Sequence, residues 1–406
     1  MSMNDTHAAP RKFVVIACEA SGDLLGEGLV SALKDRFPGC SVEGIGGEKM
    51  AAAGMLLWKH YDELSVMGLV EVLKHLPRLL KLRKWVLDKT LELSPDAFIG
   101  IDGPDFNLGL EKKLKRAGIK TVHYVSPSIW AWREGRAKTI KQSADRVLCL
   151  FPMEPPIYDK YGMASTYVGH PLAADFETHP EKALARRRLE IEVEGRWLGI
   201  LPGSRQGEIE RLGRVFMQAA LLIHRKHPDI RFLIPMASAR ARDALLKVID
   251  DLHIPRKGDE VVAEELEWAS VRVLTSVVAG KSHDVMKASD VLLLASGTAA
   301  LEGLLAKRPM VVAYKIAPLT HFIVKGLGIL KIDRYSLPNI LAQGTVVQEL
   351  MQDDCTAPKV AAALLNLLEN PAASAMQVER FHDLHEGLRG SGSFGAAQAV
   401  GEVIGA

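Results

Sequence analysis

The chain has 406 residues, of which 48% are hydrophobic and 25% charged, ordinary values for a globular protein of about two or three domains. Its formal net charge of +2 gives no reason to expect nucleic acid as a partner. The cysteines form no Cys-x-x-Cys pair, which argues against a zinc site or a disulfide framework and fits a reducing cytoplasm; they are Cys18, Cys40, Cys149 and Cys355.

Short apolar runs alternate with helix-like runs along the chain, a pattern typical of parallel sheets with crossover helices. In the first half the predicted strands are 13–18, 42–45, 97–101, 121–125, 146–150 and 166–168. A second series follows the polar stretch 176–182 and comprises 197–200, 230–234, 271–274, 291–294 and 310–313. We therefore expect two α/β domains, 1–172 and 173–370. The helical segment 371–406 could cap the second domain or cross back onto the first.

Two candidate catalytic carboxylates follow predicted strands. Glu19 ends the first strand and opens a tight turn, and Asp102 follows the buried pattern at 97–101. Because parallel strands end at the same edge of a sheet, the two carboxylates are expected to lie together in the cleft between the domains. Asp102 would be a general base that takes a proton from an attacking hydroxyl. The alternative is a helix cap, a role that Asp105 or Asn107 would fill more naturally.

The segment 66–89 predicts a long helix that is broken or kinked near Pro77. It combines apolar residues with many Lys and Arg, as helices that lie on anionic bilayers often do. A second such segment is 316–331. For each, the alternative is a core-facing helix whose lysines extend to water. No run of about 18 apolar residues occurs, so no membrane-spanning helix is expected.

Two glycine- and serine-containing turns in the second half each follow an apolar run and open a helix, LPGSR at 201–205 and ASGTAALE at 295–302. Helix N-termini offer unpaired N–H groups and a positive dipole end to phosphate. Arg205 would neutralise a pyrophosphate, and Glu302 would accept hydrogen bonds from ribose hydroxyls. Either turn alone could be an ordinary helix cap, but together they favour a nucleotide-sugar site.

A further turn, SLPN at 336–339, places Asn339 ahead of a helix, where it could bind a donor or phosphate or simply cap. No metal site is expected, because the acidic pairs at 250–251 and 353–354 do not follow apolar strands and the histidines lack metal-ligand spacing. The P-loop and the G-x-G-x-x-G fingerprint are both missing, so ATP hydrolysis is not expected.

Longer motifs, in order over nearly the whole chain, resemble those of one enzyme family. The most specific are GIDGPDFN at 100–107 and YVSPSIWAWR at 124–133. The others are EASGDLLG at 19–26, VMGLVEVL at 66–73, VGHPL at 168–172, LPGSR at 201–205, LASGTAALE at 294–302 and SLPN at 336–339. On these motifs the chain is identified as a member of the lipid-A-disaccharide synthase family. Cys18 stands where the family often has glycine, a departure that affects only the fine geometry of that loop.

The resemblance implies an α/β fold of the GT-B type, with two Rossmann-like domains facing a central cleft. It implies an inverting, metal-independent transfer of 2,3-diacylglucosamine from UDP-2,3-diacylglucosamine to 2,3-diacylglucosamine 1-phosphate (lipid X). The products would be UDP and the β(1→6) disaccharide of lipid A, and no cofactor is implied. The implied location is peripheral, on the cytoplasmic face of the inner membrane of Gram-negative bacteria. Some family members form homodimers with exchanged C-terminal segments.

The resemblance also assigns roles by matching motif. Asp102 would be the general base, and Glu19 a supporting carboxylate. The UDP-sugar donor would be bound by Gly203, Ser204, Arg205, Ser296, Gly297, Thr298, Glu302 and Asn339. The helix at 66–82 would face the membrane and the acyl chains through Met67, Leu69, Val70, Leu73, Leu76 and Leu80.

Two other functions remain to be weighed. A UDP-sugar epimerase could use the same architecture, but the basic, apolar helix argues against a purely soluble substrate. A non-catalytic lipid-binding protein could retain a nucleotide fold, but the strand-end carboxylates and the paired phosphate turns argue against it.

Overall fold

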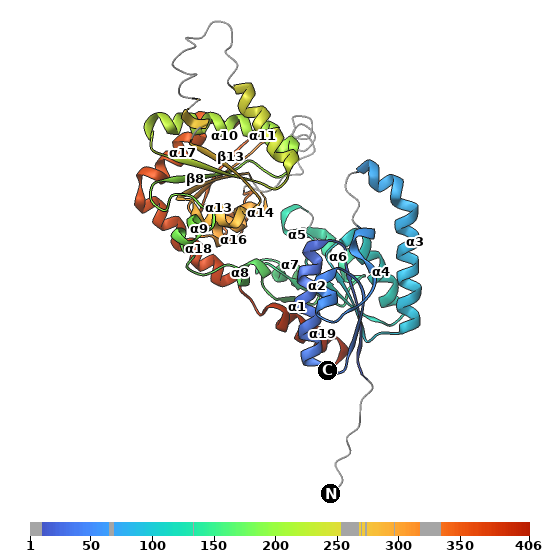
Figure 1. The fold of residues 1–406 in the computed structure, drawn as a ribbon. Helices are drawn as coiled ribbons and strands as arrows, with labels where there is room; N and C mark the ends of the chain where they lie inside the picture. Colours follow the sequence, from blue (N-terminus) through green and yellow to red (C-terminus); the bar gives the residue numbers. More distant parts are fainter. Residues whose placement is uncertain are drawn as a thin grey trace. The chain divides into compact units, whose positions relative to one another are not determined.

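The computed structural model describes residues 10–64, 69–132, 134–252, 268, 270–272, 274–295, 297–316 and 334–406. For residues 69–75 and 131–132 it describes the backbone only. The chain forms two compact units. One unit comprises Met1–Pro171 and Gly387–Ala406, and the other comprises Leu172–Glu386. Each contains a parallel sheet with helices on both faces (Figure 1).

In the first unit, the parallel strands lie in the order β3-β2-β1-β4-β5-β6-β7. Their bounds are β1 Lys12–Ala17, β2 Ser41–Gly46, β3 Leu56–His60, β4 Ala97–Ile101, β5 Lys120–Tyr124, β6 Arg146–Cys149 and β7 Ser165–Tyr167. The strand order reverses between the neighbours β1 and β4. Such a reversal is the point at which doubly wound sheets bind ligands, at the carboxyl ends of the strands.

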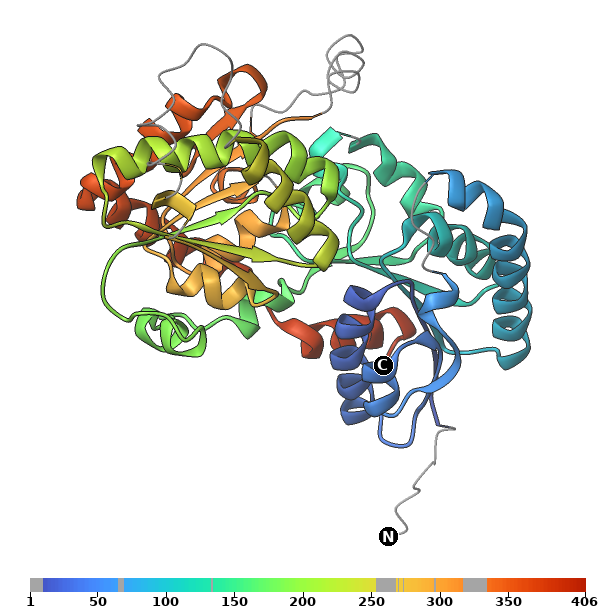
Figure 2. The same cartoon turned by 45° about the horizontal axis from the view of Figure 1, so that its top comes forward.

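Helices cover both faces of this sheet because the side chains on both faces of its strands are apolar. Phe13 and Val15 of β1 pack with α1 and α19, whereas Val14 and Ile16 pack with α3 and α4. Both views draw α19, the last helix of the chain, beside α1 (Figures 1 and 2). The helices of this unit are α1 Ala20–Arg36, α2 Glu48–Ala52, η1 Tyr61–Glu63, α3 Leu69–Leu93, α4 Pro104–Arg116, α5 Ile129–Trp132, η2 Glu134–Arg136, α6 Ala137–Lys141, α7 Pro155–Lys160 and α19 Gly392–Ile404.

The second unit repeats the arrangement, with the parallel order β10-β9-β8-β11-β12-β13. Its strands are β8 Trp197–Leu201, β9 Arg231–Met236, β10 Thr275–Ala279, β11 Val291–Ala295, β12 Met310–Tyr314 and β13 Gln348–Met351. Here the order reverses between β8 and β11, which pair through Val291–Leu294 and Leu198–Leu201. The second unit therefore has its own switch point.

The helices of the second unit also cover both faces of its sheet. One apolar core joins α10, α11 and α17 to the sheet, and a smaller one joins α9 and α13 to the opposite face. The helices are α8 Pro171–Asp175, α9 Lys182–Arg188, α10 Gln206–Lys226, α11 Ala239–Leu252, α13 Ser282–Ala288, α14 Thr298–Leu305, α16 Leu337–Leu341, η3 Gln352–Asp354, α17 Ala357–Glu369 and α18 Pro371–Leu388. After α18 the chain returns to the first unit.

The predicted α/β class with two Rossmann-like units is confirmed, and most predicted strands agree with the structure to within a residue or two at each end. The strand predicted at 271–274 is wrong: Val271 and Arg272 lie in a helical turn, and β10 begins at Thr275. The sequence prediction missed β3 and β13, which are short edge strands. The helix predicted at 316–331 falls almost entirely outside the described residues.

Candidate active site

The switch point of the first sheet brings Glu19 and Asp102 together. Glu19 follows β1 and precedes α1, and Asp102 follows the neighbouring strand β4. Glu19 is exposed, and its carboxylate accepts a hydrogen bond from the Ser21 hydroxyl. The two carboxylates are close enough for the charge of Glu19 to raise the pKa of Asp102. The predicted pairing at one sheet edge therefore holds in the fold.

The backbone at Asp102 adopts an uncommon conformation. Asp102 has φ of 50° and the next strand end, at Val125, has φ of 80°, both in the left-handed region that L-residues rarely occupy. The Asn107 amide fastens the turn by donating to the carbonyl oxygen of Asp102 at 2.8 Å. Gly103, rather than Asp102, is the N-cap of α4, so the capping alternative for Asp102 is not realised. Strained backbone of this kind clusters at functional sites.

Opposing electrostatic effects act on Asp102. Burial is the largest and raises the pKa of this carboxyl, and the nearby charge of Glu19 raises it further. A hydrogen bond from the backbone N–H of Gly103 and the charge of His123 act in the other direction. A carboxylate with a raised pKa is a stronger base, as general-base catalysis requires.

A cavity of about 710 Å³ is lined by Glu19 and by Gly103, the residue after Asp102; Asp102 itself is not among the lining residues. It lies within the first unit, among the starts of α1 and α4 and the first half of α3. One part of its wall is polar and the other is apolar. The polar lining includes Glu19, Ser21, Arg83 and Asp105, and the apolar lining includes Leu64, Leu76, Leu79, Leu80 and Phe106. This combination suits an amphiphile with a polar head and hydrocarbon chains.

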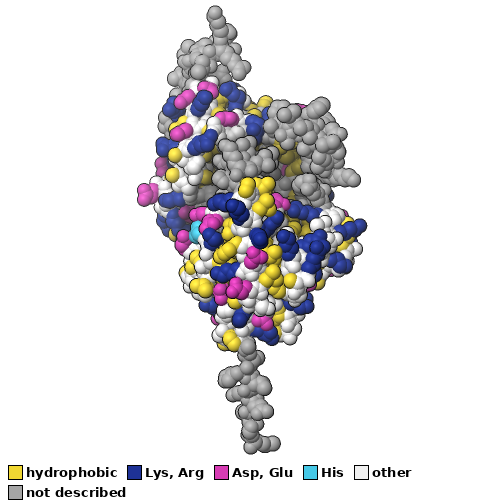
Figure 3. Space-filling model, turned by 90° about the vertical axis from the view of Figure 1, so that its right-hand side faces the viewer, with side chains coloured by type: hydrophobic (Ala, Val, Ile, Leu, Met, Phe, Trp, Pro, Cys, Tyr) yellow, Lys and Arg dark blue, Asp and Glu magenta, His cyan; other side chains and the backbone are white. Residues whose placement is uncertain are grey.

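Helix α3 carries the residues predicted to contact membrane or acyl chains. Leu76 and Leu80 line the cavity and are 42% and 46% exposed. Leu69, Val70 and Leu73 lie in α3 with their side chains outside the description, and Met67 lies outside the described residues. Figure 3 faces the side of the molecule on which α3 lies, where hydrophobic side chains are interspersed with Lys and Arg. Within the part of the chain that is described, every helix is too short or too polar to cross a bilayer.

In the second unit, the two predicted phosphate turns follow the two central strands. The first turn follows β8, and its Gly203 has φ of 116°. A Cβ there would lie 2.6 Å from Oε2 of Glu208, so both conformation and space require glycine. Ser204 and Arg205 are exposed just ahead of α10. No ion pair of the Arg205 guanidinium occurs among the described residues, which leaves its charge available to an anion.

The second turn follows β11 and opens α14. Gly297 is its N-cap with φ of 145°, and Thr298 is the first helical residue; Ser296 lies outside the described residues. Glu302 is one turn into the helix, with Oε1 3.7 Å from Nε2 of His283. Because β8 and β11 are neighbours, the N-termini of α10 and α14 open at the same switch point. Two helix N-termini at one sheet edge form a favourable site for a diphosphate.

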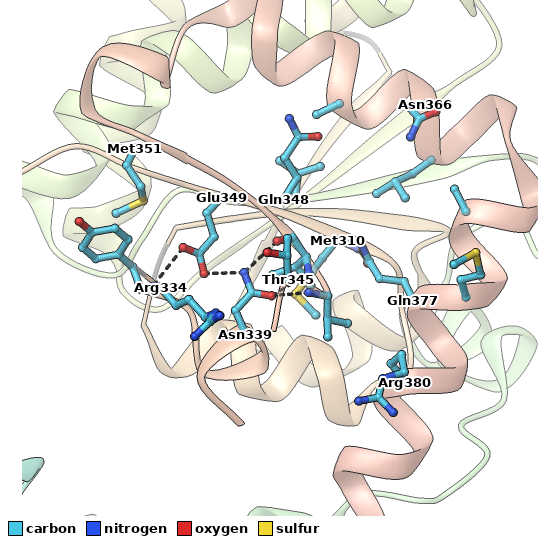
Figure 4. Close-up of a pocket in the computed structure, with 18 of the residues that line it drawn as sticks. Met310, Arg334, Asn339, Thr345, Gln348, Glu349, Met351, Asn366, Gln377 and Arg380 are labelled. Atoms are coloured by element: carbon cyan, nitrogen blue, oxygen red, sulfur yellow. Dashed lines mark hydrogen bonds between the residues drawn. The ribbon is translucent and has the colours of Figure 1, made fainter. Parts of the chain in front are cut away.

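Asn339 is buried in a network of its own (Figure 4). Its Oδ1 accepts hydrogen bonds from the backbone N–H groups of Val346 and Val347. Its Nδ2 donates to the carbonyl oxygen of Val347 and to Oε1 of Glu349. The amide thereby ties α16 to the residues that lead into β13, beside a cavity of about 990 Å³. Direct donor binding by Asn339 stays a prediction, and it would require one of these bonds to open.

The sequence analysis missed an acid–base pair beneath the Asp102 turn. Glu111 of α4 and His123 of β5 are both completely buried, with 2.7 Å between Oε1 and Nδ1. The sequence did offer a signal: Glu111 and His123 are ionisable residues at positions where the surrounding apolar pattern predicts burial. It also missed the places of Tyr61 and Arg83 in the wall of the cavity, which they line from the consecutive elements η1 and α3.

Solved structures with the same fold include enzymes that act on sugars. A glycosyltransferase of kitacinnamycin aligns with a TM-score of 0.56 at 17% identity, covering 97% of this chain and 99% of that one. The UDP-GlcNAc 2-epimerase from Neisseria meningitidis, solved with UDP-GlcNAc, aligns with a TM-score of 0.59 at 11% identity and the same coverage. Together with the paired switch points, these likenesses define the fold class as GT-B.

Sequence relatives identify the enzyme within that class. A model of the lipid-A-disaccharide synthetase family matches residues 13–403. The lipid-A-disaccharide synthase of Xanthomonas oryzae pv. oryzae is 50% identical over 399 residues, 98% of this chain and 88% of its own length. That of Xylella fastidiosa is 47% identical, covering 98% of both chains. The chain belongs to the lipid-A-disaccharide synthetase family and is a glycosyltransferase.

Proposed function

We propose that Asp102 is the general base of the reaction that defines this family. In that reaction, 2,3-diacylglucosamine is transferred from UDP-2,3-diacylglucosamine to 2,3-diacylglucosamine 1-phosphate. The observation that carries the proposal is the position of Asp102 and Glu19 at a switch point, where Glu19 and the residue after Asp102 line a cavity with polar and apolar walls. The polar part would receive the sugar of the acceptor, and the apolar part would receive its acyl chains.

In the proposed step, Asp102 takes the proton of the acceptor 6-hydroxyl as the oxygen attacks the anomeric carbon of the donor. A new C–O bond forms while the bond between that carbon and the diphosphate oxygen breaks. UDP leaves with the electron pair, and configuration inverts. A positioned base of this kind is typically worth about 10²–10⁴-fold in rate. Glu19 would orient the acceptor by accepting from its hydroxyl groups.

The second unit would hold the leaving group. Arg205 and the N-termini of α10 and α14 would stabilise the charge that develops on the diphosphate, without a metal ion. Gly203, Ser204, Ser296, Gly297 and Thr298 would present backbone N–H and hydroxyl groups to it. Glu302 would accept from the ribose hydroxyls, and Asn339 would shape the site through the residues that it holds.

Helix α3 would place the enzyme on the cytoplasmic face of the inner membrane. Leu76 and Leu80 are exposed on this helix, which also carries Arg78, Lys81 and Lys84 on its surface. The apolar side chains would enter the interface while the cations contact anionic headgroups. Further along the helix, Nζ of Lys89 lies 4.5 Å from the ring of Trp58 and 5.2 Å from that of Trp85. Such amphipathic aromatic rings favour the membrane interface.

A homodimer with exchanged C-terminal segments is a further proposal. Ala396 and Val400 of α19 pack in the same core as Leu29 and Leu33 of α1. An exchange would preserve this contact, because α19 of one copy would occupy the same place on another. Light scattering of the purified protein gives the mass that decides whether it is a dimer, and a cysteine pair placed between α1 and α19 would cross-link two chains only if α19 is exchanged.

The central experiment mixes the enzyme with both acylated sugars in EDTA and follows UDP release and disaccharide mass. The wild type is expected to form both products, and Asp102→Asn to form them at least about 100-fold more slowly. UDP release that requires a metal would contradict the metal-free leaving-group site. Near-wild-type turnover by Asp102→Asn would remove the base assignment. A UDP-sugar change without any acceptor would instead indicate an epimerase.

A further inference from the structure

Arg83 is a half-buried cation in the wall of the 710 Å³ cavity. Its guanidinium makes no ion pair and no hydrogen bond with any of the residues that the structure describes. Two other cations of α3 have contacts: Arg78 donates to the carbonyl oxygen of Glu63 at 3.1 Å, and Nζ of Lys89 lies 4.5 Å from the ring of Trp58. A half-buried charge without a partner loses hydration without compensation, so an anionic ligand is expected beside Arg83.

The guanidinium of Arg83 is seated against α4. A Cβ at Gly109 of that helix would lie 3.0 Å from Nη1 of Arg83, so a larger residue there would crowd the cation. Gly109 lies about 9 Å along α4 from Gly103, the residue that follows Asp102. Arg83 and the turn that carries Asp102 are therefore two separate points along one helix.

The charges of the cavity wall leave one place for an anion. Arg83 is the one cation among the described residues that line the cavity. The acidic lining residues have partners of their own: Glu19 accepts from the Ser21 hydroxyl, and Oδ1 of Asp105 lies 3.5 Å from Nη2 of Arg136. Carboxylates repel a phosphate, so an anionic group that enters this part of the wall is attracted by Arg83 alone.

We propose that Arg83 binds the 1-phosphate of the acceptor and makes the enzyme select a phosphorylated acyl sugar. This rests on the proposed function, in which the cavity receives 2,3-diacylglucosamine 1-phosphate. A phosphate monoester carries a charge of about −1.5 to −2 at neutral pH. A guanidinium matches two of its oxygens with two parallel N–H groups. The 1-phosphate and the 6-hydroxyl are borne by different carbons of the sugar, so they require two separate contacts, Arg83 for one and the Asp102 turn for the other.

The headgroup of a phospholipid would offer Arg83 the same chemistry, because α3 also carries exposed apolar side chains. The position of Arg83 favours the acceptor. Lys81 and Lys84 are exposed on the same helix, where a headgroup can reach them, whereas Arg83 is half-buried between the cavity and α4. The two sources also make different demands: an acceptor contact sets substrate preference, and a headgroup contact sets vesicle binding.

The test compares two acceptors with the full-length enzyme, 2,3-diacylglucosamine 1-phosphate and the same acyl sugar with a free anomeric hydroxyl. The wild type should have the higher kcat/KM with the phosphorylated one. Arg83→Gln should lower that value by about 10- to 100-fold, mostly through KM, because the contact is present in the ground state and the transition state alike. With the unphosphorylated acceptor, kcat/KM should change little. Arg83→Lys should recover part of the loss, since it keeps the charge.

The matched control is Arg116→Gln, which removes an exposed arginine at the end of α4, outside the cavity, and should leave both values unchanged. Thermal unfolding checks the folding of each variant. Equal losses with both acceptors in folded Arg83→Gln would overturn the proposal. So would weaker binding to phosphatidylglycerol-containing vesicles with the acceptor preference intact, which would assign Arg83 to a lipid headgroup. If the wild type forms no disaccharide from either acceptor, the proposed function itself fails and takes this assignment with it, a result distinct from the other two.

Discussion

The backbone N–H of Asp102 donates to the carbonyl oxygen of Tyr124 at 2.8 Å, so the residue that follows β4 is fixed to the end of β5. This bond continues the ladder of the two strands by one step and ends it at a residue in the left-handed region. The carboxylate is thereby placed by two rigid strands rather than by a loop, as precise proton transfer requires.

Replacing Asp102 by Asn should stabilise the fold while it removes activity. Burial and Glu19 disfavour the charged carboxylate, and Asn tolerates φ near 50° better than most residues. Thermal unfolding at neutral pH should show a Tm higher by about 2 °C. Asp105→Asn, in the first turn of α4, is the control; it weakens only an exposed ion pair of 3.5 Å with Arg136 and should change Tm little. A lower Tm for Asp102→Asn would contradict this account of the site.

Arg205→Ala should lower kcat/KM by about 100-fold, because the departing diphosphate loses a cation. Arg205→Lys should recover part of the loss, since it keeps the charge without the planar guanidinium. Arg196→Ala is a matched control at the opposite end of β8, where the guanidinium pairs with Asp229 at 2.8 Å. Steady-state kinetics with varied donor concentration measure all three. An equal loss in the Arg196 variant would indicate general destabilisation.

Leu80→Glu should weaken productive binding of acylated substrates, because it places a charge in the apolar wall of the cavity. We expect KM for the diacylated acceptor to rise by about tenfold and binding to anionic vesicles to fall. Leu91→Glu is the control, since Leu91 is 41% exposed on the same helix and does not line this cavity. Equal effects of the two substitutions would show that the cavity has no special part in binding.

Glu154 should make the stability of the fold depend on pH. It is 1% exposed, and burial raises its pKa to about 7 from a usual value of 4.5. Because the folded pKa lies above the unfolded one, folding favours the protonated form, and stability is lost as pH rises from 4.5 to about 7. Glu154→Gln should therefore raise Tm at pH about 8 by about 3 °C and at pH about 5 by almost nothing. An equal change in Tm at both pH values would contradict this linkage.

The order of apolar runs was enough to predict the central strands and, with them, the positions of Glu19 and Asp102. A residue that directly follows a buried strand has its location fixed by the strand itself. The edge strands β3 and β13 escaped prediction because edge strands are half-exposed and lack a continuous apolar run; Leu56 in β3 is 62% exposed. The strand predicted at 271–274 is wrong because short apolar runs also occur in buried helical turns.

Sequence patterns could not predict the pair Glu111–His123 or the hydrogen-bond network of Asn339. Each depends on how a helix is laid over its sheet, and spacing along the chain does not encode that placement. The sequence predicts that Asn339 binds a ligand or caps a helix; the structure adds that its amide accepts hydrogen bonds from the backbone of Val346 and Val347. Residue type indicated hydrogen bonding, but only the fold identifies the partners.

The return of α19 to α1 has a consequence for biosynthesis. The second unit is one uninterrupted stretch of chain, whereas the first needs residues from both termini to complete its core. During synthesis, the apolar face of α1 therefore stays uncovered until α19 has been translated. Completion of the first unit is therefore coupled to synthesis of the whole second unit, which lies between its two segments in the sequence.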